Sequence, residues 1–234
     1  MFVEQPRASL MREQVKDAIR KAITELRLVP GQRLIERELV EWSGSSRATV
    51  REAIRELAAE GIVQIIPQRG AIVSSPSPRE AREIYDVRAN LEGLAARQCA
   101  ENATPAQVRA LKRAFEAFKR TADSGNPTAM LRSKTRVYDA MFDGAGNTTV
   151  RGILEQLQAR VTALRSISMG NPGRPAATVG EIKAIVEAIA AHDAEGAERA
   201  CVAHVRAAAA IALAALEETV ADGTGPAKGR PSPS

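Results

Sequence analysis

One periodicity dominates this chain. From about Arg79 to Thr219, apolar residues recur at the three- and four-residue spacing of an α-helix, as in the stripe that joins Ile84, Leu91 and Ala95. The helical pattern is interrupted near Thr104-Pro105, Ser124–Pro127, Gly144–Asn147 and Gly170–Pro175. About six antiparallel helices packed as a bundle suit this length. Only 3% of the residues are aromatic, which argues against a β-sandwich or barrel and for a mainly α fold.

The first 75 residues follow a different pattern, in which short helices precede a run of β-branched residues. The pattern predicts a helix over Val15–Leu26, a short helix over Glu36–Trp42, a turn over Ser43–Ser46, a helix over Arg47–Glu60, and a hairpin of Val63–Ile66 with Ala71–Val73. This order is helix, turn, helix and a small β-hairpin.

Two prolines and three serines mark Ser74–Pro78 as a linker. We therefore expect one domain over residues 8–75 and a helical domain over residues 79–219. Residues 220–234 are rich in Gly, Pro and Ser without apolar periodicity, which predicts a disordered tail.

Composition restricts the class of protein further. The net charge of +5 permits an anionic partner, but the excess is spread over both domains, so any basic patch must be local. No run of about 18 uncharged apolar residues and no leader sequence is seen, so we expect a cytoplasmic protein without a membrane span. Cys99 and Cys201 lack CxxC spacing and are expected to be buried, reduced thiols. No GxSxG, HExxH or Gly-rich phosphate motif is present, so an enzyme is not expected.

The helix that begins at Arg47 carries the chemistry of the N-terminal domain. Ser46 is a candidate N-cap, and Arg47, Arg51 and Arg55 lie one turn apart on the face opposite Val50. In a helix-turn-helix the second helix enters the DNA major groove, where guanidinium groups bind guanine edges or phosphates. The alternative is a solvated face on which Glu52 and Glu56 pair with these arginines.

Five segments in order carry a resemblance to a known family: Leu28–Leu34, Glu36–Leu39, Ser46–Leu57, Glu60–Ile62 and Arg69-Gly70. Across the stretch that holds these segments, the chain resembles the GntR family of bacterial winged helix-turn-helix regulators. The resemblance implies that the hairpin is a wing and that DNA is contacted by Arg37, Ser46, Arg47, Thr49, Arg51, Arg69 and Gly70. One departure is Ile35, where many relatives have Ser or a similar cap, so the short helix after it is expected to start less firmly.

The second domain resembles the all-helical effector domain of the FadR-type branch, in its FCD subgroup. The likeness is carried by Tyr85–Arg88, Leu91-Glu92, Ala145–Asn147, Glu181–Ile185, Ala188-Ile189 and Asp193–His204. Many members of that subgroup hold a divalent metal with an Asp and three His. In this chain those positions fall on Lys134, Tyr138, Ile182 and His204, so we predict no metal of that kind and no cofactor.

An effector pocket without metal would need cations for an anionic metabolite. The candidates for effector binding are Arg88, Arg136, Tyr138, Arg165 and His204, with Arg132 and Arg174 nearby in the pattern. The alternatives are that Arg88 pairs with Glu92 while the other arginines are solvated, and that His204 is a hydrogen-bonded core residue. Tyr138 could equally fill the place of the metal, with its hydroxyl bonded to Lys134 or His204.

These interpretations lead to one principal functional hypothesis. We expect a homodimeric regulator that binds a palindromic operator in double-stranded DNA through its winged helix-turn-helix and senses a small organic acid, a carboxylate, in the helical effector-binding and dimerisation domain. The alternatives are a DNA-binding regulator whose effector pocket is vestigial and, from another class, an enzyme tethered to DNA, for which the motifs are missing.

Overall fold

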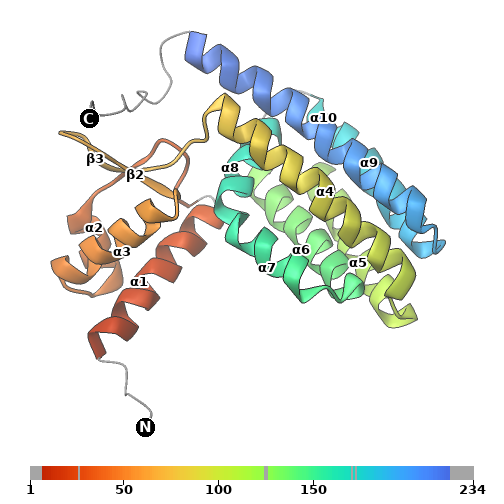
Figure 1. Cartoon of the computed structure of the whole chain (residues 1–234), viewed down its shortest axis with the longest axis horizontal. Helices are drawn as coiled ribbons and strands as arrows, with labels where there is room; N and C mark the ends of the chain where they lie inside the picture. Colours follow the sequence, from red (N-terminus) through yellow and green to blue (C-terminus); the bar gives the residue numbers. More distant parts are fainter. Residues whose placement is uncertain (1–6, 26, 124–125, 170, 172, 222–234) are drawn as a thin grey trace, which may run out of the picture. The chain divides into compact units, whose positions relative to one another are not determined.

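The computed structural model describes residues 7–25, 27–123, 126–169, 171 and 173–221. The chain divides into two compact units, Met1–Ser75 and Pro76–Ser234 (Figure 1). Most of the tail predicted at 220–234 lies outside the described residues. Positions 220 and 221, which were assigned to that tail, instead end the last helix.

Three helices form most of the first unit: α1 (Arg7–Thr24), α2 (Glu36–Ser43) and α3 (Arg47–Ala59). Helix α1 buries Val15 and Ile19, and α3 buries Val50 and Leu57. The predicted boundaries of α2 and α3 agree to within a residue. Helix α1 begins eight residues before the prediction, because its first turns carry few apolar side chains from which a period could be read.

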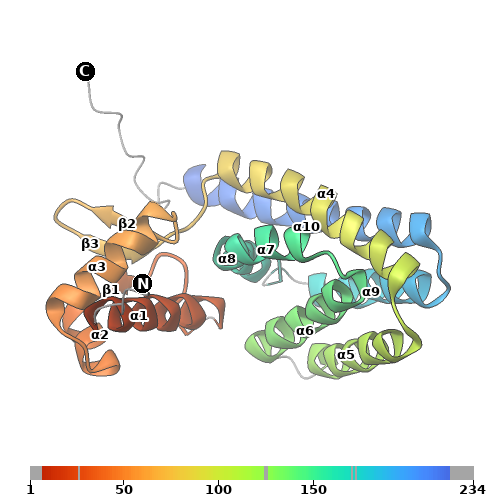
Figure 2. The same ribbon diagram turned by 60° about the horizontal axis from the view of Figure 1, so that its bottom comes forward.

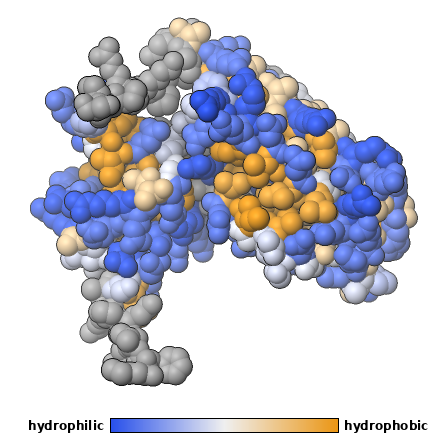
Figure 3. Space-filling view, in the orientation of Figure 1, coloured by the Kyte–Doolittle hydropathy of each residue, from blue (hydrophilic) through white to orange (hydrophobic). Residues whose placement is uncertain are grey.

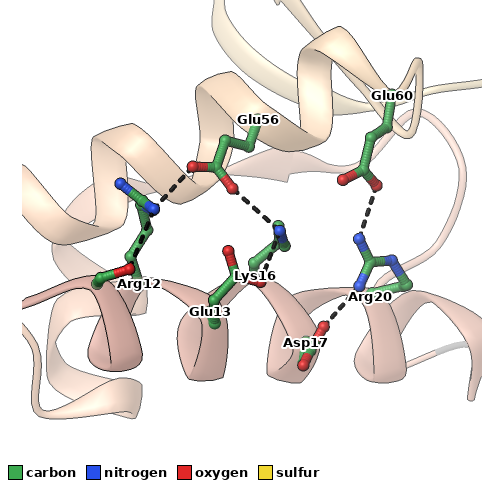
Figure 4. Close-up of polar contacts among 8 residues, drawn as sticks. Arg12, Glu13, Lys16, Asp17, Arg20, Glu56 and Glu60 are labelled. Carbon is green, nitrogen blue, oxygen red and sulfur yellow. Dashed lines mark hydrogen bonds and ion pairs between the residues drawn. The ribbon is translucent and has the colours of Figure 1, made fainter. Parts of the chain in front are cut away.

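Charged side chains join α1 to α3 across this apolar contact (Figure 4). Glu56 lies 2.8 Å from Arg12 Nε and accepts a hydrogen bond from Lys16 Nζ at 3.0 Å, and Arg20 bridges Asp17 and Glu60. Such partly exposed pairs each contribute about 1 kcal/mol or less. These pairs show that Glu56 is engaged with α1 and does not neutralise the arginines of α3.

A three-stranded antiparallel sheet completes the first unit: β1 (Arg33–Leu34), β2 (Val63–Ile66) and β3 (Gly70–Val73), in the order β1-β3-β2. Leu34 pairs with Ala71, and Val63 pairs with Val73. The hairpin of β2 and β3 was predicted, and β1 was not. A two-residue strand is too short to show the alternation by which strands are read from sequence.

The described residues of the second unit form helices joined by short loops, without a strand. Its helices are α4 (Pro78–Asn102), α5 (Pro105–Asp123), α6 (Pro127–Ala145), α7 (Thr148–Gln156), α8 (Gln158–Met169), α9 (Arg174–Ala190) and α10 (Ala194–Ala221). The count is seven where the sequence suggested about six. Two breaks lie outside the predicted interruptions, at Leu157 between α7 and α8 and at residues 191–193 between α9 and α10, and neither Gly nor Pro marks them in the sequence.

Helices α4 and α10 lie side by side along most of their length (Figures 1 and 2). Small side chains permit this approach: a Cβ atom at Gly93 of α4 would lie 2.8 Å from Val202 Cγ2 of α10. Helices α4 and α6 are packed equally closely, since a Cβ atom at Gly144 would overlap Cys99 Sγ. Close helix packing through Gly and Ala explains why the domain needs so few aromatic residues.

Helix α10 is unusually apolar. By length and composition alone it could cross a membrane, because an 18-residue window within Ala194–Glu218 has a mean hydropathy of 1.6, a test that core helices of soluble proteins also pass. Its buried residues Ala197, Cys201, Val205, Ala208 and Ala212 recur every three or four positions. This spacing is that of a bundle helix with one buried stripe. Both cysteines are free and buried, as predicted.

Candidate functional site

The start of α3 is fixed by its cap. Gly44 ends α2 in the left-handed conformation, with φ of 64°, and Ser46 then accepts a hydrogen bond from the backbone N–H of Thr49 at 3.1 Å. The Thr49 hydroxyl is 2.9 Å from the Ser46 hydroxyl. The predicted N-cap at Ser46 is confirmed. The cap therefore fixes where α3 begins, and with it the positions of the exposed Arg47 and Arg51 on the helix.

Replacing Ser46 by alanine should remove this cap and lower the free energy of unfolding of the first unit by about 1 kcal/mol. Ser46→Asn, which keeps a capping oxygen, should restore the loss. The chain's one tryptophan, Trp42, lies in this unit, so its fluorescence in a urea titration reports the change. Equal stability of the alanine and asparagine variants would contradict the capping role.

A hollow of about 500 Å³ lies beside α3 in the first unit. It is lined by Arg33, Leu34, Ile35, Glu36, Arg37, Arg47, Gly70 and Ala71. The three arginines among these residues are exposed. Strand β1, helix α2, helix α3 and the hairpin thus contribute to one basic concave surface. Arg33 was absent from the predicted set because its strand was not expected.

The hairpin tip projects Arg69, which is exposed. Gln68 and Gly70 both have positive φ, at 65° and 81°. Gly70 accepts this conformation at no steric cost, which gives a reason for glycine at the tip.

Carboxylates engage some of the predicted arginines. Arg51 Nε lies 2.8 Å from Glu36 Oε2, Arg55 pairs with Glu52 at 2.7 Å, and Arg37 lies 3.9 Å from Glu41. In the part of the chain that the structure describes, no ion pair is found for Arg47. The alternative of a salt-bridged face therefore describes Arg55 well, whereas Arg47 is left with its full hydrogen-bonding capacity.

Helix α2 begins at Ile35, whose side chain makes no capping hydrogen bond. The expected departure at this position is confirmed.

The second unit contains a cluster of buried polar side chains, which we call the buried cluster. Its members come from five helices: Tyr85, Arg88 and Glu92 of α4, Lys134 and Tyr138 of α6, Arg165 and Ser168 of α8, Arg174 and the partly buried Glu181 of α9, and His204 of α10. Arg88 and His204 are 0% exposed and Lys134 is 2% exposed. Charged groups are rarely buried to this degree unless they are paired or functional.

Glu92 is central to one part of the buried cluster. It accepts a hydrogen bond from Arg88 Nε at 2.8 Å, and Arg165 Nη2 lies 3.7 Å from the same carboxylate oxygen. The Arg88 guanidinium lies over the Tyr85 ring at 5.0 Å, and that of Arg165 over the Tyr138 ring at 4.3 Å. Burial would raise the pKa of Glu92, but the charges of Arg88 and Arg165 lower it below its usual value. Glu92 is therefore ionised.

Glu181 is central to the other part. It accepts hydrogen bonds from both Nη atoms of Arg174, one at 2.7 Å, and a close one from His204 Nδ1. Burial opposes ionisation of Glu181, yet the bonds from His204 and Arg174 lower its pKa to about 2. Burial, followed by the charge of Lys134, lowers the pKa of His204 to about 3. A neutral imidazole that donates from Nδ1 leaves its Nε2 as a bare acceptor.

Many polar atoms of the buried cluster have no hydrogen-bond partner among the residues that the structure describes. They are Tyr85 Oη, Arg88 Nη1 and Nη2, Glu92 Oε2, Tyr138 Oη, Arg165 Nε, Ser168 Oγ, Arg174 Nε and His204 Nε2. Each unpaired buried polar group costs about 1–3 kcal/mol, so such a concentration requires an explanation, such as an unseen ligand or water.

The structure brings together four of the five predicted effector residues: Arg88, Tyr138, Arg165 and His204. The fifth, Arg136, is exposed on α6 and lies outside the buried cluster, as does Arg132. Arg88 does pair with Glu92, as the alternative held, but Arg165 and Arg174 are buried rather than solvated. The Tyr138 hydroxyl is bonded to neither Lys134 nor His204. In the sequence, Tyr85 and Glu181 were named only among the residues that carry the family resemblance. Their helical spacing from Arg88 and Arg174 could have indicated that they belong to the same cluster.

The residues of the buried cluster do not fit a divalent metal. At the family's ligand positions stand the Lys134 ammonium, the Tyr138 phenol and the buried alkyl chain of Ile182, beside His204. The only imidazole there already uses Nδ1 for Glu181. Among the described residues, no group of three or more His, Cys, Asp or Glu side chains is placed to hold a metal.

Comparison with known families agrees with both units. The model of bacterial regulatory proteins of the gntR family matches residues 11–73, and the FCD domain model matches residues 83–207. The chain is 30% identical over 195 residues to a probable D-xylose utilization operon transcriptional repressor of Paenarthrobacter nicotinovorans, covering 83% of this chain and 85% of that protein. It is 25% identical over 194 residues to the transcriptional repressor RspR of Escherichia coli, covering 83% and 85% of the two chains.

Solved structures show the same fold. The chain matches McbR/YncC of Escherichia coli with a TM-score of 0.71 at 22% identity, over 91% of this chain and 96% of that one. It matches a putative GntR regulator of Rhodococcus with a TM-score of 0.72 at 20% identity, over 87% and 97% of the two chains. The chain therefore belongs to the GntR family, as a transcriptional regulator with an N-terminal DNA-binding domain and a C-terminal FCD effector domain.

Proposed function

We propose that this regulator recognises a two-fold symmetric operator and that a small anionic metabolite, held by the buried cluster, alters operator binding. The observation that carries the sensing part is the set of buried donors without partners that converge from α4, α6 and α8. The observation that carries the DNA part is the exposed row of arginines at the capped start of α3.

The basic concave surface suggests how DNA is engaged. Arg47, without an ion pair among the described residues, is the best placed to donate two hydrogen bonds to a base edge. Arg51 would exchange Glu36 for a phosphate or a base. Arg37, Ser46 and Thr49 lie where backbone phosphates would pass, and Arg69-Gly70 would reach the adjacent minor groove. To this predicted set we add Arg33.

The test begins with genomic fragments selected on the purified protein, which should yield a palindromic motif. Arg47→Ala or Arg51→Ala should then weaken binding to that motif by roughly 5- to 150-fold, the equivalent of about 1–3 kcal/mol for a base-reading side chain. Fluorescence anisotropy of a labelled operator measures the change. The control is Arg199→Ala, an exposed arginine of α10 paired only with Glu195 among the described residues. Unaltered operator affinity in both variants would refute the assignment of α3 as the recognition helix.

A homodimer is the assembly that a palindromic operator requires. The helical unit offers an apolar surface for it: Figure 3 shows apolar side chains gathered over one face of this unit. Its exposed large apolar side chains include Val87 of α4 and Ile153 of α7, at 41% and 40% exposure. Sedimentation of the full chain should give twice the monomer mass. We place this function in the cytoplasm, where GntR regulators meet DNA.

The route from effector to DNA would run through α4. This helix begins at Pro78, directly after the linker, and carries Arg88 about 15 Å along its axis. Its covalent continuity makes α4 the element whose position a ligand can change, with coupling of about 1–3 kcal/mol expected. The operator affinity of the wild-type protein should change in the presence of an organic acid that binds it. The vestigial-pocket alternative predicts instead that no acid changes that affinity.

A further inference from the structure

The charges of the buried cluster do not balance. Arg174 donates two hydrogen bonds to Glu181, so this ion pair carries no net charge. Around Glu92, by contrast, stand Arg88, Arg165 and Lys134, all at most 5% exposed. Glu92 is thus the one buried carboxylate beside three buried basic side chains, while the exposed Asp139 borders the same small cavity as Glu92 and Arg165. When Lys134 is protonated, two positive charges are left uncompensated in a low-dielectric interior, a costly arrangement unless an anion joins it.

The unpaired atoms describe the missing partner in more detail. Arg88 Nη1 and Nη2, Arg165 Nε and the hydroxyls of Tyr85 and Tyr138 can donate, as an oxyanion requires. Two others can only accept, namely Glu92 Oε2 and His204 Nε2. A ligand made only of carboxylates would satisfy the donors and leave these two acceptors unpaired. Hydroxyl groups on the ligand would satisfy both.

We propose that the buried cluster is a metal-independent site for a hydroxylated organic anion with two negative charges, in which the Lys134 ammonium supplies the cation. This inference rests on the proposed function and deepens it by naming the ligand class. Arg88 and Arg165 would hold one carboxylate, Lys134 would face the other, and the ligand hydroxyls would donate to Glu92 and His204.

The electrostatics of Lys134 agree with this role. Burial, followed by the charges of Arg165 and Arg88, lowers the pKa of Lys134 well below its usual value. The titratable and charged groups that face Lys134 are Arg88 and Glu92 of α4, Tyr138 of α6, Arg165 of α8, Arg174 of α9, and Cys201 and His204 of α10. Only one carboxylate in this set favours the ammonium form. A bound dianion would add the charge that restores it.

Space for the ligand must be opened by side-chain movement. The cavity bordered by Glu92, Tyr138 and Arg165 has a volume of about 10 Å³, enough for roughly one water molecule. Arg88, Arg165 and Lys134 have long, flexible side chains, so their head groups can move apart around an anion. Such opening would displace α6 and α8 relative to α4, which is the kind of movement that sensing requires.

The test is isothermal titration calorimetry of the full wild-type chain, without DNA and with a chelator present. Three four-carbon probes are compared: tartrate with two charges and two hydroxyls, succinate with two charges, and butyrate with one charge. Tartrate should bind at least tenfold more tightly than butyrate, with succinate between them. Lys134→Met should lower tartrate affinity at least tenfold and reduce the advantage of tartrate over butyrate. Lys183→Met, on exposed α9 surface, should change neither.

Each contrary result has a defined meaning. Butyrate binding as tightly as tartrate, binding lost with the chelator, or no binding of any dianion would overturn the site. Succinate matching tartrate would overturn the hydroxyl assignment. Because the probe series uses the wild-type protein, it stands even where Lys134→Met fails to fold, which circular dichroism would show. Tartrate binding that leaves operator affinity unchanged would refute the proposed sensing function and leave this site intact.

Discussion

Glu92→Leu is expected to lower the free energy of unfolding of the helical unit by about 3–5 kcal/mol, the usual cost of removing one partner from a buried ion pair. Glu92 is 1% exposed, and it is the carboxylate that Arg88 and Arg165 share. Without it, two guanidinium groups remain in the interior with no compensating charge. Urea unfolding followed by circular dichroism at neutral pH measures the loss.

Two further variants separate charge from packing. Arg88→Met combined with Glu92→Leu replaces the pair by apolar side chains and should recover at least half of the loss, because only Arg165 is then left without its carboxylate. Glu83→Gln, on the same helix, removes an exposed carboxylate that pairs with Arg79 and should cost less than about 0.5 kcal/mol. If Glu92→Leu is as harmless as Glu83→Gln, the buried pair described here does not exist.

The pH dependence of this effect has a defined sign. The pKa of Glu92 is lowered on folding, so its contribution is present above the carboxylate's unfolded pKa of about 4.3 and is lost as pH falls toward its folded value. The stability that comes from the Glu92 charge should therefore be fully present at neutral pH and shrink in acid.

Much of the first unit was predictable because its signals are local. The Ser46 cap, the Gly44 turn and the β-branched strands each depend on a few neighbouring residues. The missed features depend on distant ones. Strand β1 exists because Arg33 and Leu34 pair with Ile72 and Ala71 of β3, some 40 positions away. Arg33 joins the basic surface only through that pairing.

The buried cluster shows where sequence patterns fail in the second unit. A helical period places Arg88 and Glu92 one turn apart, but it does not say whether that face meets solvent or three other helices. Arg136 and Arg165 look alike in the sequence, yet one is exposed on α6 and the other is 5% exposed on α8. Packing between helices decides whether a charged side chain is buried, and local periodicity in the sequence does not report that packing.

The buried polar groups without partners in the buried cluster also indicate that this part of the core was selected for more than stability. A core built only for stability would place apolar side chains where Lys134 and Arg165 stand, since buried charges seldom stabilise a fold. Natural proteins break this rule chiefly at functional sites. In the buried cluster, the buried charges lie beside the polar atoms that have no hydrogen-bond partner among the described residues.

Lys134→Met provides the complementary result: we expect it to stabilise the ligand-free protein by about 1–4 kcal/mol at pH 7, as exchanges of buried charges for apolar groups of similar volume often do. Burial lowers the pKa of Lys134, so over the interval between the folded and unfolded values the folded state binds fewer protons than the unfolded state. The advantage of the variant over wild type should therefore grow as pH drops from about 10, until the folded pKa of Lys134 is reached. Urea titrations between pH 6 and pH 10 measure this trend.

The exposed Lys183 supplies the comparison, because Lys183→Met loses only a surface pair with Glu187. That variant should be slightly less stable than wild type, with a difference that hardly varies below pH 9. A destabilised Lys134→Met, or an advantage independent of pH, would mean that Lys134 is compensated in the free protein and that the cluster has no unmet charge. A stabilised variant that has also lost anion binding would show that this lysine is kept for its ligand at the expense of the fold.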